Sequence, residues 1–98
     1  ISKGNTFDFH GGEMETSMVM AIDEDLVKLK TSEKGIPKNT AMQTHLSWLA
    51  TDWVTEKGKP IGIGGDPSGA TKEKGKIILS VSAKEIAKQL IAIRDFKE

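Results

Sequence analysis

The sequence predicts an α/β fold that forms one part of a larger domain. Apolar residues recur at intervals of three and four between residues 13 and 27 and again after residue 71, which is the spacing of amphipathic helices. Residues 6–9 and 46–56 fit extended segments. These extended pieces are few, and a sheet needs about three or more strands, or helices packed on it, to be stable alone. We therefore expect residues 1–98 to be a single partial domain of a longer protein.

The first expected helix runs from Glu13 to Val27. Gly12 or the turn before it would start this helix, and Glu13 and Glu15 would lie in its first turn, where negative charge is favoured. The predicted apolar stripe consists of Met14, Met18, Ala21 and Ile22, with Val19 and Leu26 nearby. This stripe is expected to face the rest of the protein.

The middle of the chain is less regular. Residues 28–45 are polar and predict a long loop, which in a compact domain is often functional or packs on a partner. Residues 46–56 fit either a helix or a strand, and their Thr and Trp content favours a strand. Residues 58–69 are rich in Gly and Pro and predict a turn region.

The last expected helix begins at Thr71, which is a candidate N-cap. Its predicted apolar face consists of Ile78, Val81, Ile86, Leu90 and Ile93. Gly75 weakens the first turns by roughly 1 kcal/mol relative to Ala. Its presence there is consistent with a close approach to another backbone.

Composition excludes several function classes. The 98 residues include 14 basic and 14 acidic side chains, so no long-range field would attract nucleic acid or anionic lipid. No apolar stretch reaches the roughly 18 residues of a membrane span, and the N-terminal residues lack a signal core. The chain has no Cys, which excludes disulfides and thiolate metal sites. These features fit a cytoplasmic protein.

The segment His10-Gly11-Gly12 is the strongest candidate for active-site chemistry. A His at a Gly-rich entry to a helix can approach a substrate closely, because glycines leave room and permit unusual backbone angles. Imidazole is suited to proton transfer near neutral pH. The alternative is a His in an ordinary loop.

Two carboxylates, Glu13 and Glu15, follow directly. Residues two apart on a helix point about 200° apart, so these two side chains cannot both face one site. One would face a metal or substrate while the other caps the helix or faces water, although each could simply favour a helix N-terminus. Thr16 and Ser17 would support the site by hydrogen bonds or be satisfied within the helix.

Other candidates are weaker. Residues 62–67 do not match the spacing of a dinucleotide-binding loop or a P-loop, and we interpret them as a tight turn. A nucleotide-binding role for residues 62–69 is a third hypothesis. We expect His45 to be a solvated loop residue, and Trp48 and Trp53 to serve packing or an interface. Two distant His and scattered carboxylates form no recognisable metal cluster.

Two motifs resemble one protein family. Residues 10–22, with Asp-Leu-Val at 25–27, resemble the His-Ala/Gly-Gly-x-x-Glu-Thr-Ser segment of the creatininase (creatinine amidohydrolase) family, which precedes an apolar helix and an acidic-Leu-Val ending. Residues 62–75 resemble the Gly-Asp-Pro, Ala-Thr and Glu-Lys-Gly stretch of the same family. The resemblance runs from about residue 8 to the end and identifies the C-terminal portion of the family.

The resemblance implies a three-layer α/β/α fold with a mostly parallel sheet, and a homo-oligomer, usually a hexamer. It also implies hydrolysis of a cyclic amide or related C–N bond in a small molecule, by water that a divalent metal activates. The metal would be zinc, manganese or iron, and most of its ligands lie in the family's N-terminal half. The remainder of the same protein would then be the first partner of this chain, and the fragment alone would be inactive.

The resemblance also assigns residues. His10 matches the family His that contacts substrate and passes a proton to the leaving nitrogen. Glu15 matches the Glu of Glu-Thr-Ser at or next to the metal centre, so it is the candidate catalytic and metal-binding carboxylate. Glu13 matches a commonly acidic position and, with His10, Gly11 and Gly12, would bind substrate. The alternative function is a non-catalytic module for subunit packing or another interaction.

Overall fold

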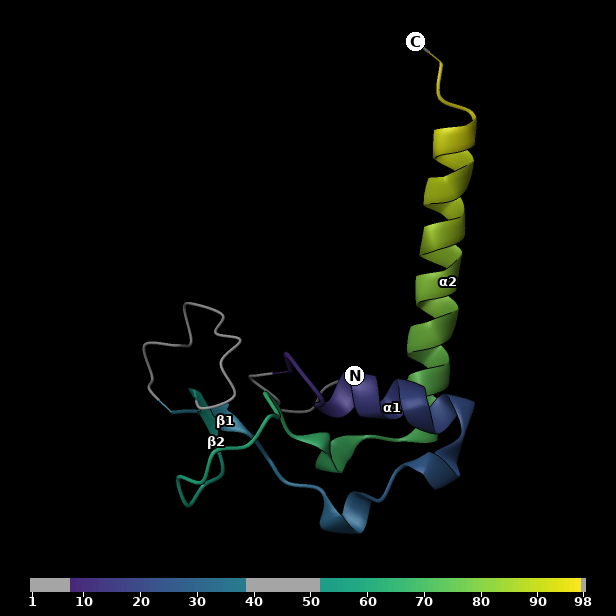
Figure 1. Cartoon of the computed structure of the whole chain (residues 1–98). Coiled ribbons are helices and arrows are strands. Elements are labelled where there is room, and N and C mark those ends of the chain that lie inside the picture. The colour runs from purple at the N-terminus through teal and green to yellow at the C-terminus, as the bar shows by residue number, and fades with distance from the viewer. Residues whose placement is uncertain (1–7, 39–51, 98) are drawn as a thin grey trace.

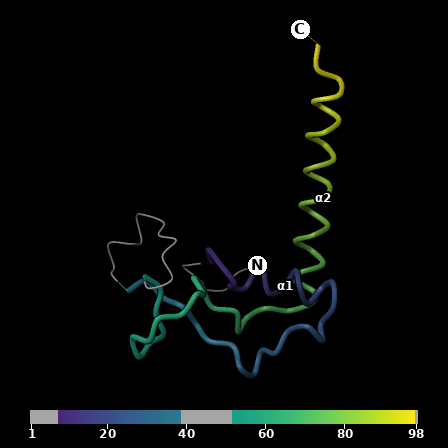
Figure 2. The backbone as a smooth tube through the Cα atoms, in the orientation of Figure 1, coloured from purple at the N-terminus to yellow at the C-terminus, as the bar shows by residue number. Residues whose placement is uncertain are grey.

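The computed structural model describes residues 8–38 and 52–97, and Figure 1 shows their arrangement. The described residues contain helix α1 (Glu13–Ile22) and strands β1 (Ile36–Pro37) and β2 (Trp53–Val54). Helix α2 (Lys72–Arg94) starts beside α1 and extends away from it, as the tube in Figure 2 also shows. Single 3-10 turns lie at Glu24–Leu26, Leu29–Thr31 and Pro67–Gly69. The mixture of helix and strand confirms the predicted α/β composition.

Helix α1 starts where predicted and ends earlier. Its N-cap residue is Gly12, and the backbone N–H of Met14 donates to Asp8 Oδ2 at 3.1 Å. The expected extension to Val27 is wrong, because Asp23 leaves the helical conformation. Its carboxylate instead accepts the N–H of Asp25 (3.1 Å), a local bond that competes with the helix and starts the next 3-10 turn.

The predicted apolar stripe of α1 does not form its buried face. Glu13, Ser17 and Met20 are buried, at helical intervals of four and three. In contrast, Ile22 and Leu26 are 75% and 68% exposed. The reason is the packing of α1 against α2, which places the small Ser17 at the closest approach of the two helices. Backbone proximity, and not the volume of apolar side chains, determines which face turns inward.

Helix α2 confirms two predictions. Thr71 is its N-cap, with Oγ1 accepting the N–H of Lys74 at 3.1 Å. A Cβ added to Gly75 would lie 1.8 Å from the carbonyl oxygen of Ser17, so this glycine does permit close backbone packing.

The second half of α2 has no cover among the described residues. Of the predicted apolar face, Ile78 is buried, whereas Leu90 and Ile93 are 61% and 72% exposed. Figure 1 shows this part of the helix standing clear of the other elements. No helix in residues 8–38 and 52–97 is long and apolar enough to cross a membrane.

The two strands pair in antiparallel direction, with Ile36 opposite Val54 and Pro37 opposite Trp53. The expected mostly parallel sheet of a three-layer fold is therefore not what the described residues form. Parallel sheets require helices on both faces, and here α1 and α2 pack on each other instead. Strand β2 confirms the extended conformation of residues 53–54, while residues 46–51 lie outside the described residues, as does the end of the expected 28–45 loop.

Two isolated antiparallel backbone bridges, each involving a glycine, lie next to this small sheet. Gly64 pairs with His10 and Gly65 pairs with Gly35, so the turn region of the second motif lies between two other extended segments. Trp53, only 6% exposed, packs beneath Gly64 and contacts the Phe9 ring at a centroid distance of 5.8 Å. The predicted packing role of Trp53 is confirmed, and Trp48 lies outside the described residues.

Candidate functional site

His10 lies on the surface at the entry to α1. Its carbonyl accepts the N–H of Gly64 at 2.8 Å, and its own N–H donates to the carbonyl of Gly64 at 3.2 Å. The second motif therefore fixes the backbone of His10, although the two segments are far apart in sequence. The imidazole is left at the surface, where it can reach a small molecule.

The turn after His10 is closed by the side chain of Glu15. Gly11 has φ of +64°, in the left-handed region that favours glycine. Its N–H donates to Glu15 Oε2 at 2.5 Å, and Thr16 Oγ1 donates to its carbonyl at 3.4 Å. Thr16 thus supports the turn by a hydrogen bond, which was one of the two predicted roles. The exposed carboxylate of Glu15 is held over the turn within a few residues of His10.

A hollow of about 380 Å³ lies beside this turn. Gly11, Glu15 and Thr16 line it, and Lys28 and Ser32 add further polar groups. Apolar walls come from α1, from the 3-10 turns after it and from the second motif, namely Val19, Leu26, Val27, Leu29, Ile63 and Pro67. A pocket of this size with a few polar groups suits a small ligand that has an apolar side.

Glu13 faces the opposite side of α1. Its carboxylate is 3% exposed and forms an ion pair of 2.6 Å with Lys74 Nζ, which also donates to the carbonyl of Gly69 at 2.8 Å. The predicted divergence of Glu13 and Glu15 is confirmed, since one side chain is buried and the other is exposed. The prediction that Glu13 binds substrate stays a prediction.

The two sequence motifs form one structural unit. Ser17 Oγ accepts the N–H of Thr71 at 3.2 Å, and Ser17 is completely buried. Three other contacts also connect the two motifs: the close approach at Gly75, the Glu13–Lys74 ion pair and the backbone pairing of His10 with Gly64. The second motif therefore contacts the inner side of the first motif along its whole length, from His10 to Ser17.

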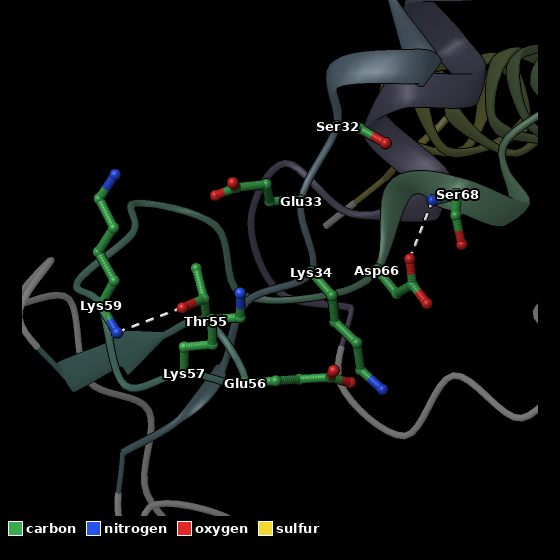
Figure 3. Close-up of a pocket in the computed structure, with 9 residues that line it drawn as sticks. All are labelled: Ser32, Glu33, Lys34, Thr55, Glu56, Lys57, Lys59, Asp66 and Ser68. Carbon is green, nitrogen blue, oxygen red and sulfur yellow. Dashed lines mark hydrogen bonds between the residues drawn. The ribbon is translucent and has the colours of Figure 1, made fainter.

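A second, larger hollow of about 540 Å³ adjoins the second motif at Asp66 and Ser68 (Figure 3). Its lining is polar and its charges balance: Ser32, Glu33, Lys34, Thr55, Glu56, Lys57, Lys59, Asp66 and Ser68. Hydrogen bonds from the hydroxyl and the backbone N–H of Ser68, together with the positive charge of Lys34, hold the pKa of Asp66 below its ordinary value. None of the predicted site residues lines this hollow.

The Gly-rich turn does not offer a phosphate cradle. The N–H groups of Gly64 and Gly65 donate to the carbonyls of His10 and Gly35, and the N–H of Ser68 donates to Asp66. A phosphate-binding loop needs such groups to point at the ligand. This bonding agrees with the interpretation of residues 62–67 as a tight turn.

The described residues do not fit a complete metal site. Within residues 8–38 and 52–97, no three His, Asp or Glu side chains lie close enough together to hold a metal ion. A protein zinc site uses at least three protein ligands, and Glu15 provides one exposed carboxylate. His45 lies outside the described residues.

Sequence reasoning missed two residues of this unit. Asp8 receives the N–H of Met14 and lies so close to Gly12 that a Cβ there would clash with its carboxylate. Lys74 is the partner of Glu13. The position of Asp8, just before a Gly-Gly helix start, could have indicated its role. The role of Lys74 depends on a contact between distant segments and gives no such local signal.

The described residues thus form one unit in which a histidine turn and a carboxylate are held by a second motif. The family model described as creatininase, creatinine amidohydrolase, matches residues 1–90 of the 98. The chain therefore belongs to the creatininase family, and this membership suggests amidohydrolase-type activity. No curated protein and no solved structure matches the chain.

Proposed function

We propose that this chain forms the C-terminal part of the active site of a creatininase-type amidohydrolase, with the turn from His10 to Glu15 as its contribution. The main observation behind this proposal is that the second motif fixes the backbone of this turn, while the side chains of His10 and Glu15 stay exposed to solvent. The remainder of the same protein would supply the other wall of the site.

In this proposal His10 acts as the general acid. Hydrolysis of an amide adds a water oxygen to the carbonyl carbon and breaks the C–N bond, and the departing nitrogen must gain a proton. An exposed imidazole on a Gly-rich turn can approach that nitrogen and deliver the proton. Gly11 and Gly12 would line the approach to the substrate.

Glu15 is proposed as one ligand of the divalent metal that the family implies, zinc, manganese or iron. Its Oε2 accepts the N–H of Gly11, a bond that orients the carboxylate as the outer partners of metal ligands commonly do. The other ligands would come from outside the described residues. The hollow beside Glu15 would hold the part of the small-molecule substrate that does not react, with its apolar side toward Val19 and Ile63.

The role of His10 is tested in the intact protein that contains this chain. His10→Ala should lower kcat on a cyclic amide by about 10²- to 10⁴-fold, the usual range for loss of a general acid. The melting temperature should stay unchanged, because the His10 side chain is exposed. The matched control is His45→Ala, the other histidine of the chain. Full turnover in His10→Ala would remove this role.

The role of Glu15 is tested by metal content after dialysis. Glu15→Gln should lower divalent-metal affinity at least about tenfold. Glu24→Gln is the control, because Glu24 is also an exposed glutamate near α1 but lies outside the hollow. Equal metal retention in both variants would exclude Glu15 as a ligand.

A second candidate function is a non-catalytic module for subunit packing. The observation that favours it is the exposed apolar face on the second half of α2, which includes Ile86, Leu90 and Ile93. An intact protein that holds no divalent metal and hydrolyses no cyclic amide, but loses its homo-oligomeric state on Leu90→Glu, would favour this function.

A further inference from the structure

An ion pair between the buried Glu13 and the partly exposed Lys74 joins the two motifs at the start of α1. Glu13 is the first residue of the helix, and its carboxylate is 3% exposed. Lys74 Nζ reaches it at 2.6 Å from the first turn of α2 and also donates to the carbonyl of Gly69 at 2.8 Å. A Cβ on Gly69 would come within 3.3 Å of the Glu13 carboxyl carbon, so the carboxylate is enclosed on that side as well.

Stability alone does not account for this pair. Removing the Glu13 carboxylate from water costs several kcal/mol, and an apolar residue of similar volume often serves stability as well or better. An ion pair restricts the orientation of its side chains, because the ammonium group of Lys74 must reach both the Glu13 carboxylate and the Gly69 carbonyl. The close contact of Ser17 with Gly75 already turns this face of α1 toward α2, and the pair extends that rotation to the first turn of α1.

That rotation decides where the proposed catalytic groups lie. Glu15 is two residues after Glu13, so fixing Glu13 toward α2 turns Glu15 about 200° away, to the outer side. There its carboxylate meets the N–H of Gly11. The direction of Glu15 is therefore set at the first turn of α1 by the contact of Lys74, and one turn later by the contact of Ser17 with Gly75.

We propose that Glu13 and Lys74 are positioning residues, which hold the turn from His10 to Glu15 in its working geometry without touching the substrate. The assignment rests on the proposed function of that turn. It gives Lys74 a role that lies outside the predicted site, and it gives Glu13 a role other than substrate binding.

The test uses the intact protein with Lys74→Met, Lys74→Arg and, as control, Lys76→Met, an exposed lysine on the same helix. Lys74→Met should lower kcat by about 10- to 100-fold, since a misplacement near 1 Å can cost about 10²-fold. The substrate KM should change less than kcat. Lys74→Arg should restore most of the turnover, and Lys76→Met should behave as wild type.

A spectroscopic measurement separates positioning from general damage. The backbone amide proton of Gly11, which donates to Glu15, should shift upfield in Lys74→Met. The amide of Gly58, which donates to the carbonyl of Thr55 in a separate turn, should not move. If Lys74→Met does not fold, the double variant Glu13→Gln/Lys74→Met, which leaves no buried charge, replaces it and should show the same two effects.

The outcomes distinguish this inference from the proposed function. Wild-type kcat and an unmoved Gly11 amide in the folded Lys74 variant would overturn the positioning role. A wild-type protein without amidohydrolase activity would overturn the proposed function instead, and the Gly11 amide would then decide the positioning role by itself.

Discussion

Gly75→Ala should destabilise the protein, although alanine is the better helix former. The added Cβ would lie 1.8 Å from the Ser17 carbonyl oxygen and 2.9 Å from the Ala21 Cβ. Real Cβ contacts are essentially never shorter than 3.0 Å, so the backbones of α1 and α2 must separate by about 1 Å or more. The carbonyl oxygen and carbon of Ser17 belong to helical backbone, which cannot yield as a flexible side chain would.

The magnitude follows from three opposing effects. Replacing Gly by Ala inside a helix gains about 1 kcal/mol. Overpacking a close contact costs about 1–3 kcal/mol. The separation would also break the bond between Ser17 Oγ and the N–H of Thr71, now 3.2 Å, which is worth about 1 kcal/mol. We expect a net loss of about 1–3 kcal/mol in the free energy of unfolding.

The assay is urea denaturation of the intact protein, with two glycine controls. A Cβ at Gly62 meets no described heavy atom within 4 Å, so Gly62→Ala should be neutral or slightly stabilising. Gly58 is equally open but has φ of +80°, so Gly58→Ala tests backbone strain without crowding. Unchanged or increased stability in Gly75→Ala would refute the close approach of α1 and α2.

Two further predictions concern Thr71 and Asp66. Thr71→Ala removes the hydroxyl that accepts the N–H of Lys74 and should cost about 1 kcal/mol in urea denaturation, and no loss would contradict the capping role. Because hydrogen bonds from Ser68 lower the pKa of Asp66 from its ordinary 3.8, the folded state binds fewer protons there. Its stabilisation should be complete above about pH 5 and disappear as the pH falls through the lowered pKa, and Asp66→Asn, compared by thermal melts from pH 6 to 3, should lack this pH-dependent part.

Local chemistry predicted several parts of the site correctly. The angular step of a helix separated Glu13 from Glu15, and the structure buries one and exposes the other. Thr71 was identified as an N-cap because its side chain and position match the requirement for a free acceptor at a helix start. These features depend on residues within one turn of each other, so the sequence contains the necessary information.

Features that depend on distant contacts could not be predicted in the same way. The inward face of α1 is decided by Gly75, which admits Ser17 and leaves Ile22 and Leu26 exposed. The partner of Glu13 was missed for the same reason, because Lys74 arrives from another helix. The direction of the sheet was inferred from whole family members, whereas β1 and β2 are two residues each and pair in antiparallel direction.

The antiparallel register also brings two residues that are distant in the sequence into contact. The N–H of Lys38 donates to the carbonyl of Asp52 at 2.8 Å, next to the pairing of Pro37 with Trp53. Lys38 and Asp52, which are far apart in the chain, therefore lie side by side. A pair of labels attached at these two positions would report directly whether the two strands stay paired.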